Sequence, residues 1–269
     1  WNYCHWIYFV KKLIKDSPIL FYTKANPFIT SLNIPMKTAE DFKTGQILLI
    51  DKPLTWSSFQ AVNKVRWVIR KAFDIKKIKV GHAGTLDPLA TGLLVICTGK
   101  FTKRLSEFQG QIKEYTGEIT LGGTTPSYDL ESEVTETFPT THITETQIHE
   151  TTKKFIGEIE QYPPVFSALK KDGKRLYEYA RNNEEVVINP RNVNISEFEI
   201  TKIDLPRVEF RVICSKGTYI RSLAFDFGKA LQSGGHLSKL RRTKIGDFSA
   251  DKAICPIAFE KQYLGEQTD

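Results

Sequence analysis

One segment of the sequence presents a lone carboxylate in a setting suited to chemistry. Residues 81–94 read GHAGTLDPLATGLL, and their three glycines within twelve residues predict a tight loop with an exposed backbone. Asp87 stands within this segment directly before Pro88, which favours an extended rather than a helical backbone at the aspartate. Such a carboxylate either caps a helix or turn, or is offered to a substrate as a reactive group. The local pattern leaves both interpretations open.

Motifs of several other enzyme classes are missing from the sequence. Gly99 and Lys100 do not end a P-loop, because the positions that need Gly and Ser or Thr hold Leu94 and Phe101. The GHAG string at residues 81–84 is not a dinucleotide-binding motif, and the sequence contains neither H-E-x-x-H nor G-x-S-x-G. The five histidines are scattered along the chain. We therefore expect neither a metal ion nor a cofactor.

The motif around Asp87 is specific when it is taken whole. The string GHAGTLDPLATG at residues 81–92 resembles the signature of the TruB family, the bacterial tRNA pseudouridine-55 synthases. Together with the signature, the similarity covers about residues 45–245. Four further blocks, in family order, are similar to other motifs of that family: LIDKP at 49–53, KEY at 113–115 with LG at 121–122, PPVFSALK at 163–170 with GKRLYEYAR at 173–181, and SKGTYIR at 215–221.

The resemblance implies a specific reaction. A pseudouridine synthase breaks the N-glycosidic bond of a uridine, turns the uracil and joins its C5 to the same ribose carbon. No electron is transferred and no phosphate is consumed, which agrees with the expectation of no cofactor. In the family the aspartate of the G-x-L-D-P core is catalytic, and by resemblance this role falls on Asp87. Whether Asp87 adds to the sugar, adds to the ring or removes a ribose proton stays open.

Two residues are expected beside Asp87. Arg221 lies in the block that resembles the segment with the family's active-site arginine, and a guanidinium can grip a carboxylate bidentately and keep it ionised. Tyr115 matches the active-site tyrosine, whose ring can pack against the target base while its hydroxyl reaches a proton. The structural alternatives are a surface or phosphate-binding arginine and an aromatic residue on a sheet face.

A further set of residues is predicted to contact RNA. By resemblance, His82 helps to displace bases of the RNA loop, and Lys52 either contacts a phosphate or packs near the active site. Basic side chains next to aromatic ones suit a folded RNA loop, because aromatic rings stack on unpaired bases. The predicted set is His82, Lys52, Tyr219, Lys174, Arg175, Arg241 and Arg242.

The sequence departs from the family pattern in two places. Family members often carry T-D-T-S-D after the L-G pair, but Pro126 occupies the place of the first aspartate, while Asp129 matches the second. Any active-site contact of that first aspartate is therefore in doubt. Many members also carry a C-terminal RNA-binding PUA domain, whereas about two dozen residues follow the last matching block here. We expect no PUA domain, so that the catalytic domain holds the RNA itself.

The hydrophobic pattern predicts mixed α and β structure. Strands do not alternate regularly with helices, which favours an α+β sheet over a βαβ arrangement. The resemblance adds the pseudouridine synthase fold, a mixed, mostly antiparallel central sheet flanked by helices. The pattern predicts strands at 46–50, 76–80, 115–121 and 208–214, a helix begun by the capping box SSFQ at 57–60, and helices at 144–155 and 218–231.

The composition excludes several classes of protein. The 269 residues are 41% hydrophobic and 26% charged, which excludes a disordered or collagen-like chain, and no apolar run approaches the roughly 18 residues of a membrane span. The net charge of +7, with a pI near 9.1, fits a polyanionic partner. Four widely separated cysteines exclude zinc-knuckle spacing and predict reduced, mostly buried thiols.

The first 35 residues differ from the rest. Residues 1–35 are aromatic-rich, lack a clear period and carry four lysines against one aspartate. They represent a translated upstream region, a poor targeting segment or a true extension. We expect Met36, the sole methionine, to be the start, and residues 36–269 to form one catalytic domain.

The combined interpretation is a cytoplasmic tRNA pseudouridine synthase that acts on uridine 55 of the T-stem loop. We expect a monomer with no membrane and no obligate protein partner. Three alternatives stay open: a guide-dependent enzyme acting on ribosomal RNA, an RNA-folding factor without chemistry, and a basic domain for another polyanion. An intact set of Asp87, Arg221 and Tyr115 argues against a pure binding function, because binding alone does not require it.

Overall fold

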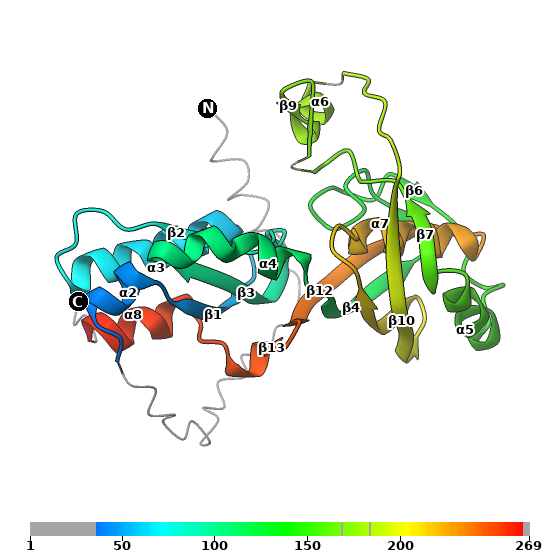
Figure 1. Cartoon of the computed structure of the whole chain (residues 1–269). Helices are drawn as coiled ribbons and strands as arrows, with labels where there is room; N and C mark the ends of the chain where they lie inside the picture. The colour runs from blue at the N-terminus through cyan, green and yellow to red at the C-terminus, as the bar shows by residue number, and fades with distance from the viewer. Residues whose placement is uncertain (1–35, 168, 183, 266–269) are drawn as a thin grey trace. The chain divides into compact units, whose positions relative to one another are not determined.

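The central feature of the protein is one mixed sheet with its strands in the order β1-β3-β12-β4-β11-β10-β7 (Figure 1). A computed structural model describes residues 36–167, 169–182 and 184–265, without the side chains of residues 170, 175 and 180. The chain divides into two units, Trp1–Met36 and Lys37–Asp269, and the sequence-based expectations for residues 1–35 lie outside the described residues. The strand pairs are antiparallel apart from the short parallel pairing of β12 with β3. The predicted α+β class with a mostly antiparallel sheet is confirmed.

The main strands are β1 (Ile47–Lys52), β2 (Val80–His82), β3 (Ala90–Thr98), β4 (Lys113–Leu121), β7 (Gly157–Gln161), β10 (Arg191–Asp204), β11 (Arg207–Cys214), β12 (Gly235–Ile245) and β13 (Phe248–Ser249). Two small hairpins are β5 (Gly123–Thr124) with β6 (Glu136–Thr137), and β8 (Lys170–Lys171) with β9 (Lys174–Arg175). The helices are α2 (Ala39–Thr44), α3 (Ser58–Ala72), α4 (Leu105–Gly110), α5 (Glu145–Lys153), α6 (Leu176–Arg181), α7 (Ile220–Ala230) and α8 (Pro256–Leu264), with 3-10 turns η1 (Gly99–Arg104) and η2 (Ala250–Lys252).

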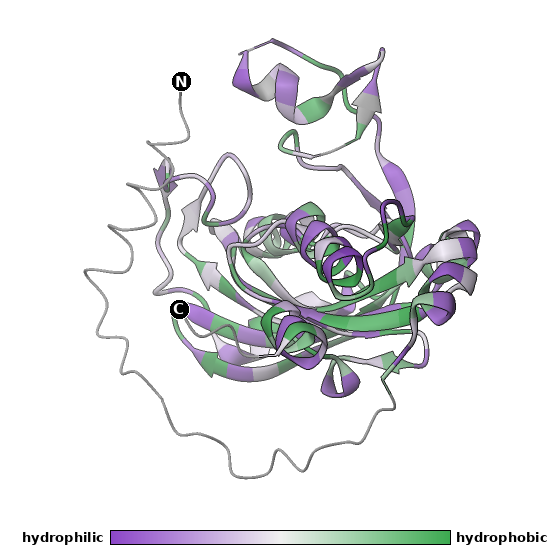
Figure 2. Ribbon diagram, turned by 90° about the vertical axis from the view of Figure 1, so that its left-hand side faces the viewer, coloured by the Kyte–Doolittle hydropathy of each residue, from purple (hydrophilic) through white to green (hydrophobic). Residues whose placement is uncertain are grey.

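Helices cover the two ends of the sheet separately. At one end α2, α3 and α8 bury a core with β1 and β3 that includes Phe42, Val65 and Ile96. At the other end α5 and α7 pack on β4, β10 and β11 around Phe210 and Phe227. Figure 2 shows the hydrophobic residues concentrated along the sheet strands and hydrophilic residues in the β8–β9–α6 insert. The middle strands β12 and β4 join the two cores and form the floor on which a site can be built.

Local sequence patterns predict most of these elements correctly. The predicted capping box is present, since Gln60 N donates to Ser57 Oγ at 3.1 Å and Ser57 N to Gln60 Oε1 at 2.7 Å. The predicted helices at 144–155 and 218–231 correspond to α5 and α7, each with slightly shorter bounds. The strands expected at 46–50, 115–121 and 208–214 correspond to β1, β4 and β11.

Two local predictions are wrong. The strand expected at 76–80 begins only at Val80, because its ladder with β3 starts at the pair Val80 and Thr98. Residues 81–94 are not one loop, because β2 and β3 occupy its two ends and leave only residues 83–89 irregular. β3 is buried over most of its length between β1 and β12, and this tertiary packing overrides the glycine content of the motif.

Two of the three described cysteines are buried in the interior of the protein. Cys97 and Cys214 are buried free thiols, as predicted, whereas Cys255 is exposed and its Sγ accepts the N–H of Ala258 at the start of α8. Cys4 lies outside the described residues. Within the described ranges no helix has both the length and the apolar character that crossing a bilayer requires.

Candidate active site

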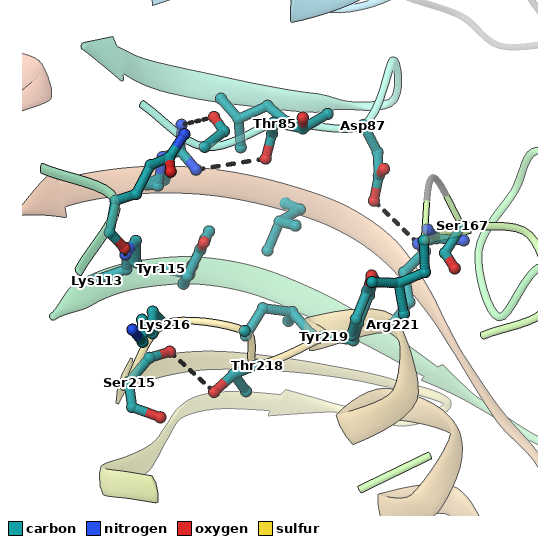
Figure 3. Close-up of a pocket in the computed structure, with 18 of the residues that line it drawn as sticks. Thr85, Asp87, Lys113, Tyr115, Ser167, Ser215, Lys216, Thr218, Tyr219 and Arg221 are labelled. Carbon is teal, nitrogen blue, oxygen red and sulfur yellow. Dashed lines mark hydrogen bonds and ion pairs between the residues drawn. The ribbon is translucent and has the colours of Figure 1, made fainter. Parts of the chain in front are cut away.

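A cavity of about 580 Å³ lies over the middle of the sheet and brings together five of the predicted site residues, Arg242 among them. Its wall contains Asp87, Tyr115, Tyr219 and Arg221, which come from a loop, a strand and the start of a helix (Figure 3). These residues are up to 134 positions apart in sequence, and only the sheet topology makes them neighbours. Among the described residues no group of three His, Cys, Asp or Glu side chains is placed to hold a metal ion.

The loop that carries Asp87 is held from both sides. Ser58, at the start of α3, accepts the N–H of Leu86 at 2.8 Å and donates its hydroxyl to Leu86 O at 3.0 Å. Thr55 N donates to Pro88 O at 2.9 Å. These bonds fix the backbone on each side of Asp87, whose side chain keeps 37% of its surface exposed toward the cavity. The carboxylate is therefore rigidly placed and open to a ligand.

Arg242 secures the same loop from the sheet side, and its contact with RNA stays a prediction. The side chain is 1% exposed, with Nε donating to Leu93 O at 2.8 Å and Nη2 to Gly84 O at 3.1 Å. A third contact joins Nη1 to Thr85 O at 3.5 Å. The guanidinium also lines the cavity, but its donors are engaged by backbone carbonyls of the loop and of β3. Arg242 therefore positions the Asp87 loop.

Lys52 is also buried, which favours packing near the active site over the alternative of a contact with an RNA phosphate. The side chain is 0% exposed, and its Nζ donates to the carbonyls of Pro53, Trp56 and Pro88. Burial lowers the pKa of Lys52 to about 8, although the charge of Asp87 opposes the shift. The ammonium group ties β1 to the residue that follows Asp87.

Arg221 is the charge partner of Asp87, but not in the bidentate form expected. Its Nε donates to Asp87 Oδ2 at 2.9 Å, while Nη1 and Nη2 donate to the carbonyls of Ser127 and Phe166 at 2.9 and 3.0 Å. Burial lowers the pKa of Arg221, but the charges of Asp87 and neighbouring carboxylates more than compensate and raise it. The guanidinium therefore stays charged inside the wall of the cavity.

Asp129 is the second carboxylate near this arginine. Its Oδ2 lies 3.6 Å from Arg221 Nε, and its Oδ1 accepts the Ser127 hydroxyl at 2.6 Å. Burial raises the pKa of Asp129, and the charge of Arg221 works against that shift. Pro126 is exposed, so the residue in the place of the first family aspartate points to solvent. Asp129 is thus the carboxylate of this segment that reaches Arg221.

Tyr115 lies in β4 between Val212 of β11 and Arg242 of β12. The side chain is 8% exposed and lines the cavity. Burial raises the pKa of its phenol, and the nearby Arg242 charge lowers it less strongly. The hydroxyl is therefore protonated over the physiological range, with its ring available as one wall of the cavity.

The other predicted RNA-binding residues lie in different surroundings. Tyr219 lines the cavity and precedes α7, where its backbone N–H and C=O both bond the buried side-chain amide of Gln161. His82 lies in β2, does not line the cavity, and burial lowers its pKa. Lys174 pairs with Glu184 at 2.6 Å on the insert, and the side chain of Arg175 lies outside the described part.

Arg241 points away from the cavity. Its Nη1 and Nη2 donate to the two carboxylate oxygens of Asp51 at 2.9 and 2.8 Å. Because side chains alternate along a strand, Arg241 and Arg242 lie on opposite sheet faces. The pair of arginines that looks like one phosphate-binding motif in the sequence thus has two separate structural functions.

Several parts of the site had no clear signal in the sequence. The carbonyls of Ser127 and Phe166 hold Arg221, and backbone acceptors have no side-chain signature. The hydroxyl of Ser167 is buried at the cavity wall with no hydrogen-bond partner among the described residues. The side-chain amide of Gln161 bonds both the backbone N–H and the backbone C=O of Tyr219 at the start of α7, and only the fold brings these groups together.

Family profiles match this arrangement over most of the chain. The profile described as TruB family pseudouridylate synthase (N terminal domain) matches residues 70–220, and the tRNA pseudouridylate synthase B C-terminal domain matches residues 221–267. The chain belongs to the TruB family. The first profile includes Asp87 and Tyr115, and the boundary between the two falls at Arg221.

Two TruB-family relatives show how far the similarity extends. The chain is 65% identical to tRNA pseudouridine synthase B of Flavobacterium johnsoniae over 225 residues, covering 83% of this chain and 98% of the relative. It is 52% identical over 227 residues to the protein of the same name from Phocaeicola vulgatus, covering 84% and 96%. These alignments span nearly the whole length of both relatives.

Solved structures with this fold include a Cbf5–Nop10–Gar1 complex, to which the chain is 30% identical with a TM-score of 0.60. A second is an archaeal box H/ACA sRNP Nop10–Cbf5 complex, 26% identical with a TM-score of 0.60. The chain is covered to 81% and 85%, but spans 54% and 57% of those chains. The TruB-family fold is therefore shared over little more than half of the Cbf5 length.

Proposed function

We propose that this protein isomerises uridine 55 in the T loop of tRNA to pseudouridine, with Asp87 as the catalytic carboxylate. The observation that carries the proposal is the Asp87–Arg221 ion pair at the wall of a cavity that also contains Tyr115. The two relatives named tRNA pseudouridine synthase B support tRNA as the substrate, because they match this chain at 65% and 52% identity.

The reaction places three demands on the site. The bond between uracil N1 and ribose C1′ breaks, the base turns, a bond forms between C5 and C1′, and C5 loses its proton. A carboxylate must face the ribose and base, the detached uracil must be retained, and a group must accept or relay a proton. Retaining the base is a large part of the catalysis, because both reaction partners stay at high effective concentration.

The residues of the cavity match these demands. Asp87 is exposed toward the cavity, and its carboxylate pairs with the buried guanidinium of Arg221. The ring of Tyr115 forms a wall against which a uracil can stack, and its protonated hydroxyl is a hydrogen-bond donor. The reaction transfers no electron and no phosphoryl group, so these side chains supply its chemistry without a cofactor.

The target uridine must leave the RNA loop to reach Asp87. Base-modifying enzymes extrude the nucleotide at a cost of a few kcal/mol in lost stacking, which is lowest where the base is already unpaired. A loop uridine is such a base, and the cavity volume of about 580 Å³ accommodates a nucleoside. We place the reaction in the cytoplasm, in line with tRNA as the substrate of the bacterial relatives.

The proposal is tested by tritium release from a tRNA transcript labelled at uracil C5. Pseudouridine and uridine have the same mass, so loss of the C5 hydrogen is the direct readout. We expect about one equivalent released per tRNA, none with Asp87→Asn, and none when uridine 55 is replaced. The Asp87→Asn variant should bind tRNA within about threefold of wild type, because the substitution keeps shape and removes charge.

Other outcomes separate the competing functions. Tight tRNA binding without release by the wild type contradicts the proposal and favours an RNA-folding factor. Release that requires an added guide RNA favours a guide-dependent enzyme, the function suggested by the similarity to the Cbf5 complexes. Gel filtration at working concentration tests the expected monomer.

A further inference from the structure

The cavity that contains Asp87 has a second, positively charged end. Lys113, Arg191 and Lys216 line the cavity together with the turn at residues 215–218, and Arg191 lies beside Gly217 of that turn. Figure 3 shows Lys113 and Lys216 at one end of the drawn cavity and the Asp87–Arg221 pair at the other, with Tyr115 between them. None of the three basic residues belongs to the set that the sequence predicted for RNA contact. We call Lys113, Arg191 and Lys216 the cationic end.

Arg191 is held in a defined direction. It is the first residue of β10 and pairs with Gln161 of β7, so its backbone is fixed by the sheet. Its guanidinium carbon lies 5.4 Å from the centroid of the Tyr219 ring, within the range of a cation–π contact. The guanidinium also lies beside Gly217, where a Cβ atom would come within 3.5 Å of Nη1. The side chain is thus set against the cavity wall before any ligand arrives.

Lys216 extends from a turn with a fixed shape. Thr218 Oγ1 donates to Ser215 O at 3.0 Å, Ser215 N donates to Asn194 O at 2.8 Å, and Gly217 has a φ of +85°. The Lys216 side chain itself is exposed at the edge of the cavity. The turn therefore places an exposed ammonium group at the edge of the cavity that Arg191 also lines.

Within the described part of the chain, neither Arg191 nor Lys216 has a carboxylate oxygen within 4.0 Å, so the described residues supply no counter-charge to either group. Several exposed or half-exposed basic residues elsewhere on the same sheet are paired with carboxylates: Arg211 and Lys244 with Glu114, Lys239 with Glu118, and Arg241 with Asp51. The contrast marks the cationic end as a place where the anion comes from outside.

Lys113 adds a third positive charge to the cationic end. Its Nζ donates to the carbonyls of Gln109 and Gln111, and the side chain is buried. Burial lowers the pKa of Lys113 to about 8, with smaller contributions from the charges of Arg242 and Lys216. Like charges that face one another without an acid stabilise a bound anion strongly in a partly desolvated cavity.

We propose that Arg191 and Lys216 bind the RNA phosphodiester that adjoins the flipped uridine. The inference rests on the proposed function, because it assumes that the ribose and base lie at the Asp87 end. A nucleotide keeps its phosphates when its base is extruded, so an anion must enter the cavity mouth with it. A guanidinium offers paired donors to two phosphate oxygens and the ammonium adds a point charge. The cationic end then sets the direction in which the strand enters.

The test combines protein variants with single neutral phosphates. We would measure binding of a T-stem loop RNA to wild type, Arg191→Gln and Lys216→Gln, with a methylphosphonate on the 5′ or the 3′ side of the target uridine. Arg207→Gln is the matched control, because this arginine pairs with Asp204 and does not line the cavity. Lys216 is exposed, so its variant keeps the fold even if Arg191→Gln does not.

We expect Arg191→Gln and Lys216→Gln each to raise Kd about five- to tenfold on native RNA, and one of the two methylphosphonates to weaken wild-type binding by a similar factor. That methylphosphonate should add less than twofold in either variant, because the contact is already lost. Additive losses at both phosphates, or losses no greater than that of Arg207→Gln, overturn the proposal. These experiments measure RNA binding only. A failure of tritium release would therefore contradict the proposed reaction without contradicting the proposed phosphate contact.

Discussion

Arg221 reaches Asp87 through one nitrogen only, with Nε 2.9 Å from Oδ2, while its other two nitrogen atoms bond the carbonyls of Ser127 and Phe166. This division gives the arginine two functions. It keeps a positive charge against the carboxylate, and it joins the Asp87 loop to the segments on both sides of the cavity. Asp87 Oδ1 is not engaged by Arg221 and is available to the substrate.

Replacing Arg221 by lysine tests this shared geometry. Arg221→Lys keeps the positive charge, but an ammonium group cannot reach three acceptors that are spaced for a planar guanidinium. We expect kcat for tritium release to fall by about 100-fold or more, with tRNA affinity within about threefold of wild type. Single-turnover release at saturating enzyme gives the comparison. A variant with nearly full kcat would show that charge alone suffices.

The neighbouring arginines of β12 are predicted to differ sharply in their effect on stability. Arg242→Met leaves the buried carbonyl of Leu93 and the half-buried carbonyl of Gly84 without their donor, and we expect unfolding free energy to fall by about 3 kcal/mol. Arg241→Gln removes a partly exposed ion pair with Asp51 and should cost less than about 1 kcal/mol. Urea denaturation of both variants tests the difference, and equal losses would contradict the assignment of Arg242 as the positioning residue.

Lys52 should make stability depend on alkaline pH. Its pKa is about 8 in the folded protein and near 10.5 in the unfolded chain, so between these values the unfolded state binds more protons. The contribution of Lys52 to unfolding free energy therefore rises with pH across this window, by about 1.5 kcal/mol from pH 8 to pH 9.5. Denaturation of wild type and Lys52→Met at both pH values isolates this contribution. The pH-dependent rise should be smaller in the variant, and an equal rise in both would exclude Lys52 as its source.

Binding of tRNA is expected to weaken as salt increases. Phosphate contacts release counterions, so each one contributes roughly 0.7 to 0.9 to the slope of log Kd against log salt concentration. With two or more contacts, Kd should rise at least about sevenfold between 50 and 200 mM salt. Arg191→Gln should lower the slope by close to one, whereas Arg207→Gln should leave it unchanged. Affinity that stays constant over this range would contradict a phosphate-based interface.

Much of the fold and part of the site followed from the sequence because their signals are local. The Ser57–Gln60 capping box, the alternation in β4 and β11 and the apolar face of α7 are determined by residues within a few positions of one another. The motif around Asp87 likewise lies in one continuous stretch. Its match to a family is a property of residue order, so it needed no knowledge of contacts.

Only the tertiary structure decided which charges serve the substrate and which serve the fold. Lys52 and Arg242 look like RNA-binding residues in the sequence, but their burial and their backbone carbonyl partners make them supports of the Asp87 loop. Arg191 and Lys216 line the cavity from separate strands and turns. The reason is physical: burial, register and the distance between charges depend on contacts between residues far apart in the chain, whereas residue type and spacing describe only what lies close along it.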